Sequence, residues 1–188
     1  MNVVVLCTGR CGSVTFTKAC GHLTNFTAGH ETFSAKIGPA RFDFPPNHIE
    51  VDNRLSWSLG GLGARWDPED VLYVHLKRDR EAVARSFLKR WDSKFRPSII
   101  RAFGHGIVQR VKDWPEEQRL DVCRHYVDTV TANIDDFLRA RPSMTVDVES
   151  VETDFPLFLD RIGAQGDREA ALDEWRVRHN ASKSSALE

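Results

Sequence analysis

Residues 2–15 read NVVVLCTGRCGSVT, and the expected architecture of the whole chain follows from them. Val3 to Leu6 form an unbroken run of branched apolar residues, which is typical of a strand buried on both faces of a parallel sheet. A turn containing two glycines follows at residues 8–13, and an amphipathic segment runs from there to Leu23. This order predicts an oxyanion site, because the first N–H groups of a helix have no partner within it and the helix dipole adds positive charge there.

Length and composition predict a single domain over residues 1–188 with room for a three-layer core. The formal net charge is −1, so no global field draws the chain to nucleic acid or a membrane surface, and an anion site has to be a local cluster. No apolar run approaches the length of a membrane span, and Met1 is followed directly by a predicted strand rather than a signal peptide. We therefore expect a cytoplasmic protein. In that compartment its four cysteines are expected to be reduced.

Apolar runs and amphipathic segments alternate along the chain, which predicts an α/β three-layer sandwich with a mostly parallel central sheet. The connection at 94–114 is expected to be either a substrate lid or irregular packing, and residues 179–188 a flexible tail or a basic segment that closes over a ligand. The predicted strands cover residues 3–6, 25–32, 48–51, 71–76 and 144–148, and the predicted helices cover 14–23, 54–60, 82–91, 115–139, 155–162 and 168–177.

Polar residues gather where four of these strands end. They are Thr8 to Ser13, His30 with Glu31, Asp52 to Arg54, and Lys77 to Asp79. Ligands of open α/β sheets bind beyond the carboxyl ends of the strands, so this placement predicts a binding or catalytic site.

The glycine turn is not a Walker A motif, because Ser13 stands where GxxxxGK[ST] needs lysine after its last glycine. That difference argues against ATP hydrolysis and phosphoryl transfer. Arg10 lies inside the turn instead, and its guanidinium can donate two parallel hydrogen bonds to an anionic oxygen.

TGRCGSVTF, residues 8–16, resembles the 5′-phosphosulfate loop of sulfotransferases that use 3′-phosphoadenosine 5′-phosphosulfate (PAPS). In that family a basic residue precedes x-Gly-Ser/Thr, as Arg10 does here. A second segment is similar to the family's 3′-phosphate site: a strand leads into Arg78, and Ser86 follows eight positions later on a helix. The resemblance covers residues 3–24 and 71–90, and the arginine in the loop is closer to the carbohydrate and bacterial type.

This resemblance implies a P-loop NTPase-like fold and a sulfotransferase that moves a sulfuryl group from PAPS to a hydroxyl or amine by in-line attack. The product would be adenosine 3′,5′-bisphosphate, and no metal would be required. The residues implied to bind the donor are Thr8, Gly9, Arg10, Cys11, Gly12, Ser13, Val14, Thr15, Arg78 and Ser86, with Arg10 also stabilising the departing bisphosphate.

The reaction needs a base to take the acceptor's proton. In the family this base is a Glu or His after the second strand, and Glu31 and His30 stand side by side here. Glu31 is favoured, because members with an arginine loop often use a carboxylate. Neighbouring strand residues point to opposite sides, so we expect one of the two to enter the site. Asp52 is a further candidate, and Arg54 either contacts an acidic acceptor or forms a salt bridge.

Two other functions remain open from sequence, a P-loop kinase of a small molecule or nucleotide and a non-catalytic nucleotide-binding module. The acceptor of a sulfotransferase is equally open among small molecules, carbohydrates, lipids and peptides, and so is the oligomeric state.

Overall fold

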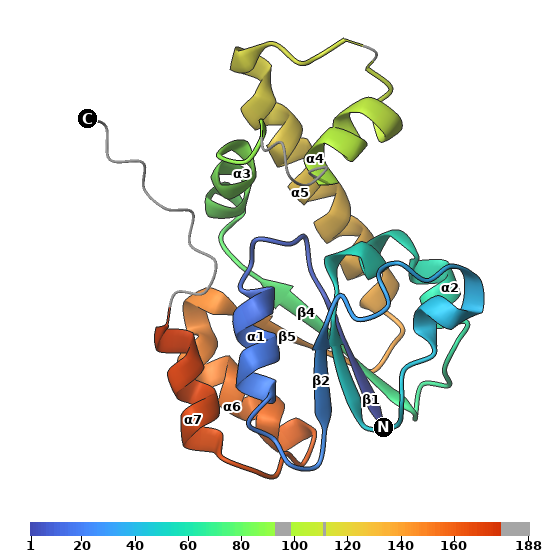
Figure 1. The fold of residues 1–188 in the computed structure, drawn as a ribbon, viewed down its shortest axis with the longest axis vertical. Coiled ribbons are helices and arrows are strands. Elements are labelled where there is room, and N and C mark those ends of the chain that lie inside the picture. The colour runs from blue at the N-terminus through green and yellow to red at the C-terminus, as the bar shows by residue number, and fades with distance from the viewer. Residues whose placement is uncertain (93–98, 111, 178–188) are drawn as a thin grey trace.

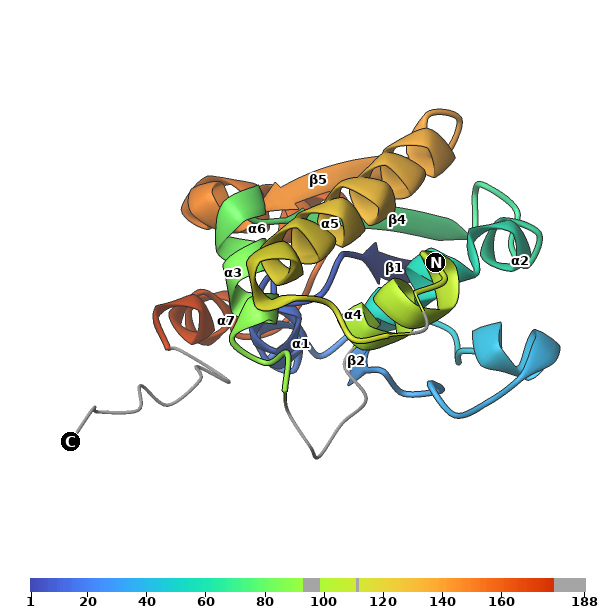
Figure 2. The same ribbon diagram turned by 90° about the horizontal axis from the view of Figure 1, so that it is seen from above.

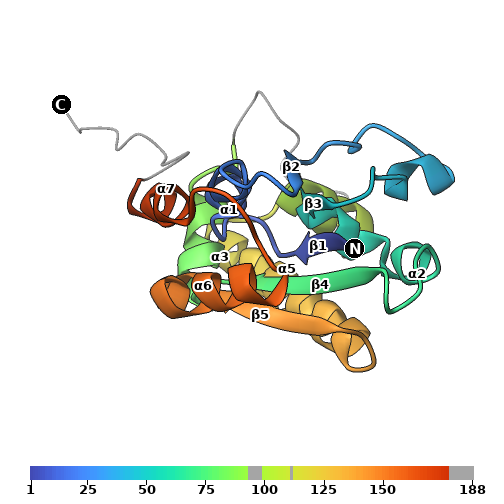
Figure 3. The same ribbon diagram turned by 90° about the horizontal axis from the view of Figure 1, so that it is seen from below.

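The computed structural model describes residues 1–92, 99–110 and 112–177. Five parallel strands form one sheet in the order β2-β3-β1-β4-β5, which can be followed across Figure 3. The strands are β1 (Asn2–Leu6), β2 (Thr27–His30), β3 (His48–Val51), β4 (Val71–Lys77) and β5 (Ser143–Asp147). The expected α/β class is confirmed, and the sheet is parallel throughout.

Helices cover both faces of the sheet, so the core has two halves (Figures 1 and 2). Val3 and Val5 pack with the helices of one face, while Val4 and Leu6 pack with those of the other, which explains why β1 is apolar at every position. The first face carries α1 (Ser13–Cys20), α6 (Val151–Arg161) and α7 (Arg168–Asp173). The second carries α2 (Leu59–Gly63), α3 (Arg80–Leu88), α4 (Ile99–Ala102) and α5 (Glu116–Leu138).

β1 and β4 lie side by side in the sheet, and the chain leaves their carboxyl ends in opposite directions. From β1 it runs through α1 to β2 at one edge, and from β4 it runs through α3, α4 and α5 to β5 at the opposite edge. Connections that leave neighbouring strands in opposite directions open a crevice at their carboxyl ends, where ligands of such sheets bind. The residues that follow β1 and β4 therefore face the same space.

The predicted helix from Arg54 to Gly60 is wrong in its boundaries. Residues Asn53–Trp57 form a 3-10 helix, and Gly60, which ends the predicted helix, lies inside α2 together with Gly61 and Gly63. A Cβ on Gly61 would lie 3.0 Å from the ring of Phe42, and one on Gly63 would lie 2.9 Å from the ring of Phe137. These glycines serve to let the rings pack closely and do not end the helix. The residues next to them in the sequence give no sign of this packing.

The segment expected to be a lid lies partly outside the described residues, at 94–98 and 111. Its described part forms α4 and a π-helical turn, Phe103–Ile107, and Phe103 is buried against Tyr126 of α5. The predicted tail, 179–188, lies outside the described residues. The four cysteines are free thiols, as expected. Within the described ranges no helix combines the length and apolar character that a bilayer crossing needs.

Candidate functional site

The turn between β1 and α1, residues 8–13, is called the glycine loop below. Three of its residues have left-handed backbone, with φ of 83° at Gly9, 62° at Arg10 and 83° at Gly12. Gly12 precedes the first residue of α1, and its carbonyl accepts the N–H of Phe16 at 2.9 Å. Left-handed residues next to a helix N-terminus turn successive N–H groups into one concavity, which suits an anion.

Two buried hydroxyls on neighbouring elements fix the start of the glycine loop. Tyr126 of α5 donates to the carbonyl of Thr8 at 2.8 Å, and Ser56 donates to the carbonyl of Cys7 at 3.2 Å. Burial raises the pKa of Tyr126, so its hydroxyl keeps the proton that it donates. Sequence analysis missed both residues, because each comes from a distant segment and neither belongs to a motif.

Arg10, Arg78 and Ser86 meet at the glycine loop. Arg10 donates from Nε to the Ser86 hydroxyl at 3.1 Å, and Arg78 donates from Nη1 to the Arg10 carbonyl at 3.1 Å. Burial lowers the pKa of Arg10, and the positive charges of Arg90 and Arg78 lower it further. Arg10, Arg78 and Arg90 are called the arginine cluster, because the last two are close enough to repel the Arg10 guanidinium, and a bound anion would offset that repulsion.

The remaining predicted loop residues divide by burial. Ser13 and Val14 are half-buried, whereas the side chains of Cys11 and Thr15 face the core, with 1% and 8% of each residue exposed. Cys11 and Thr15 are therefore placed to offer a ligand their backbone N–H groups rather than their side chains.

The two candidate bases diverge at the end of β2. His30 hydrogen-bonds through Nε2 to the Ser13 hydroxyl at 3.1 Å, so its ring lies at the glycine loop. Glu31 has a φ of 54° and forms an ion pair with Arg54, at 2.6 Å. The structure thus brings His30 to the loop, and it gives Arg54 a salt bridge with Glu31.

Asp52 is enclosed, with 1% of the residue exposed. Its carboxylate accepts from the Arg41 side chain and, at 2.8 Å, from the N–H of Arg54, so it caps the 3-10 helix that follows β3. Burial raises the pKa of Asp52, and these two hydrogen bonds partly offset that rise. Because its oxygens are already bonded and shielded, Asp52 is badly placed to accept a substrate proton.

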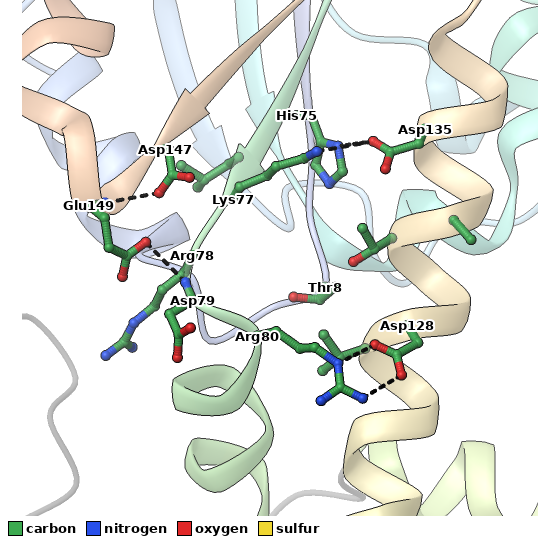
Figure 4. A pocket seen from close by; sticks show the side chains of 14 residues that line it. Thr8, His75, Lys77, Arg78, Asp79, Arg80, Asp128, Asp135, Asp147 and Glu149 are labelled. Carbon is green, nitrogen blue, oxygen red and sulfur yellow. Dashed lines mark hydrogen bonds and ion pairs between the residues drawn. The ribbon is translucent and has the colours of Figure 1, made fainter.

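A cavity of about 540 Å³ opens at the carboxyl end of β4, between that strand, α3 and α5. We call it the β4–α5 cavity (Figure 4). His75 lies at its base and donates from Nδ1 to Asp135 at 2.9 Å, and Lys77 pairs with the same carboxylate at 3.3 Å. The lining residues are Thr8, His75, Leu76, Lys77, Arg78, Asp79, Arg80, Val127, Asp128, Thr131, Ala132, Asp135, Asp147 and Glu149. Two of them, Thr8 and Arg78, also belong to the surroundings of the glycine loop.

The sequence predicted Lys77, Arg78 and Asp79 at a strand-end site, but not the β4–α5 cavity that they help to line. The available signal was a histidine inside an otherwise apolar strand, at position 75 of VLYVHLK, but its partner Asp135 lies 60 positions later. Among the described residues no group of three or more His, Cys, Asp or Glu side chains is arranged to hold a metal ion. Comparison of the chain with known protein families, with curated proteins and with solved structures finds no match.

Proposed function

We propose that this protein is a sulfotransferase that moves a sulfuryl group from PAPS to a hydroxyl or amine acceptor. The observation that carries the proposal is the meeting of Arg10, Arg78 and Ser86 at the glycine loop. These residues belong to the two segments that resemble the family's 5′- and 3′-phosphate sites, and Arg10 lies 68 positions before Arg78 and 76 before Ser86. Both segments also follow neighbouring parallel strands at the point where the chain diverges, as a P-loop NTPase-like sulfotransferase topology requires.

The residues present fit a nucleotide with charge at both ends. The glycine loop offers N–H groups at the start of α1, and the arginine cluster supplies positive charge beside it. Under this proposal the N–H groups bind the 5′-phosphosulfate, while Arg78 and Ser86 bind the 3′-phosphate. The donor supplies an activated sulfuryl group. Arg10 lies between the two ends and stabilises the charge that develops on the leaving oxygen.

His30 is better placed than Glu31 to accept the acceptor's proton. Its ring already lies against the Ser13 hydroxyl, whereas the Glu31 carboxylate is held by Arg54. The ion pair with Arg54, at 2.6 Å, holds the Glu31 carboxylate away from an incoming hydroxyl or amine. Glu31 remains a second candidate for the same role, reached if Arg54 turns to the acceptor.

Ligand-dependent thermal unfolding tests the donor site. Adenosine 3′,5′-bisphosphate at about 100 times its Kd stabilises the folded state by ~2.7 kcal/mol, which raises the Tm by roughly 5–10 °C at this chain length. Adenosine 5′-monophosphate and ATP with magnesium are expected to do much less. A larger shift with ATP and magnesium would favour a kinase instead.

Transfer itself is tested with PAPS carrying labelled sulfur and a panel of acceptors, with the product separated from the donor. We expect label on at least one hydroxyl or amine acceptor. Binding of the bisphosphate with no transfer to any of a broad panel would point to a non-catalytic nucleotide-binding module.

A further inference from the structure

The β4–α5 cavity has the opposite electrostatic character to the arginine cluster. Its lining contributes three cationic side chains and five carboxylates, so its formal charge is −2 with His75 neutral. The cations are Lys77, Arg78 and Arg80, and the carboxylates are Asp79, Asp128, Asp135, Asp147 and Glu149. A cavity with this balance disfavours an anionic ligand and favours a positively charged one.

Two of these carboxylates already have cationic partners. Asp128 forms a bidentate pair with Arg80, at 2.5 and 2.6 Å, and Asp135 pairs with Lys77. Figure 4 shows these pairs on the α5 side of the cavity.

The other three carboxylates contact backbone groups on the opposite side. Glu149 accepts the N–H of Asp79 at 3.0 Å, and Asp147 accepts the N–H of Glu149 at 3.0 Å (Figure 4). Within the described part of the chain, no Lys or Arg side chain forms an ion pair with Asp79, Asp147 or Glu149. Burial and the neighbouring Asp147 carboxylate raise the pKa of Glu149, so a cation bound here would relieve repulsion.

A ring nitrogen of a buried side chain points independently to a ligand. His75 is 2% exposed, and its Nδ1–H is used by Asp135. Because the carboxylate fixes this tautomer, Nε2 carries a lone pair and accepts hydrogen bonds. Burial lowers the pKa of His75 to about 4, so the ring is neutral near pH 7. Among the described residues no donor bonds to Nε2, although the ring lines the cavity.

We infer that the β4–α5 cavity binds a small molecule that carries both hydroxyl groups and a protonated amine, such as an amino sugar. A hydroxyl of the ligand donates to His75 Nε2, and its ammonium group lies among Asp79, Asp147 and Glu149. Val127 and Ala132 of α5 provide apolar surface for the carbon skeleton. The cavity volume of about 540 Å³ lies within the usual range for small-molecule sites.

This ligand would be the sulfuryl acceptor, and that part of the inference rests on the proposed function. Thr8 and Arg78 line the cavity and also belong to the surroundings of the glycine loop, so a ligand here lies next to the proposed donor site. Binding itself does not depend on sulfuryl transfer and is tested separately.

Glucosamine is the probe, titrated into the full chain at a pH at which its amine is protonated. Binding is followed by calorimetry and by the ring nitrogen resonances of the histidines. We expect saturable binding that moves the His75 Nε2 resonance, binding of glucose that is about tenfold weaker or more, and weaker binding still of glucuronate. Glucuronate binding as tightly as glucosamine, or a His75 resonance that does not move, would overturn the inference.

The double variant Asp147→Asn, Glu149→Gln removes two of the three unpaired carboxylates and keeps side chains of similar size in the cavity. We expect it to weaken glucosamine binding about tenfold and to leave glucose binding nearly unchanged. Glu117→Gln, an exposed carboxylate at the start of α5 outside the cavity, is the matched control. Equal affinities of the double variant and the control for glucosamine would sink the assignment of the ammonium site.

The same preparations separate this inference from the proposed function. If adenosine 3′,5′-bisphosphate binds and glucosamine does not, the cavity assignment is wrong and the donor site stands. If glucosamine binds with the stated dependence on charge and the bisphosphate does not, the cavity assignment stands and its role as acceptor site fails with the sulfotransferase proposal.

Discussion

Arg10 of the glycine loop donates from Nε to the hydroxyl of Ser86 in α3, at 3.1 Å, although 76 positions separate the two residues. The bond joins the turn after β1 to the helix after β4. Both side chains are half-buried, and Arg78 contacts the same loop from the end of β4. Burial removes hydration from the Arg10 guanidinium, and the charges of Arg90 and Arg78 repel it, so a bound anion would stabilise it.

Replacing Arg10 by alanine is expected to weaken binding of the bisphosphate and to lower kcat/KM by the value of a charge-assisted hydrogen bond, about 1.5–3 kcal/mol. Arg10→Lys should recover only part of this loss, because lysine keeps the charge but not the fork of donors. Arg139→Ala, an exposed arginine after α5, serves as the control. An unchanged affinity in Arg10→Ala would show that the loop does not hold the anion.

Arg78→Ala is expected to reduce the preference for adenosine 3′,5′-bisphosphate over adenosine 5′-monophosphate, rather than to weaken the binding of both nucleotides equally. Adenosine 3′,5′-bisphosphate should lose about tenfold or more in affinity, whereas adenosine 5′-monophosphate should lose much less, because it lacks the 3′-phosphate that Arg78 is proposed to contact. The ratio of the two Kd values, measured by calorimetry for Arg78→Ala and Ser86→Ala, checks the assignment. Equal losses for both nucleotides would place the 3′-phosphate elsewhere.

His30→Gln is expected to lower turnover by about 100-fold with little change in bisphosphate affinity, since a positioned base contributes roughly that much. Glu31→Gln should have a smaller effect, because Glu31 is paired with Arg54. Single-turnover rates with labelled donor separate chemistry from binding. The reverse order of effects would return Glu31 to the role of base.

Tyr126→Phe is expected to reduce the free energy of unfolding by about 1–3 kcal/mol, because it leaves the buried carbonyl of Thr8 without its donor. Tyr73→Phe is the matched control. Its hydroxyl donates to the Leu62 carbonyl over a longer distance, 3.4 Å, so its loss should cost less. Urea unfolding of both variants measures the difference in unfolding free energy. Equal decreases would show that the hydrogen bond to Thr8 stabilises the protein no more than the one to Leu62.

The stability of the protein should fall as the pH falls from about 6.5 to about 4. The unfolded His75 ring takes up a proton near pH 6.5, whereas burial and Lys77 lower the pKa of the folded ring to about 4 despite the opposing effect of Asp135. Between these values the unfolded state binds more protons, so the contribution, roughly 3 kcal/mol at neutral pH, is lost on acidification.

His75→Gln should remove this part of the pH dependence, since glutamine does not titrate. The measurement is the difference in unfolding free energy between wild type and variant at several pH values from 4 to 7. A difference that does not change with pH would show that His75 titrates alike in the folded and unfolded states.

Much of the fold could be predicted from local patterns in the sequence. Val71 to Leu76 and the stripe along α5 repeat at strand and helix periods, so burial follows from the chain's own spacing. The patterns failed at Gly61 and Gly63, where Phe42 and Phe137 approach from distant segments and leave little room for a Cβ. The residues next to these glycines in the sequence do not indicate those contacts.

By itself the sequence determined the parallel α/β sheet, the glycine turn after the first strand, and the gathering of polar residues at the strand ends. Each of these depends on residues within a few positions of one another, whose backbone preferences and periodicity act locally. Only the tertiary structure decided that Arg10 hydrogen-bonds to Ser86, that His30 rather than Glu31 contacts Ser13, and that His75 hydrogen-bonds to Asp135 at a cavity. Those relationships depend on the strand order, which places distant segments side by side and is set by packing across the whole chain.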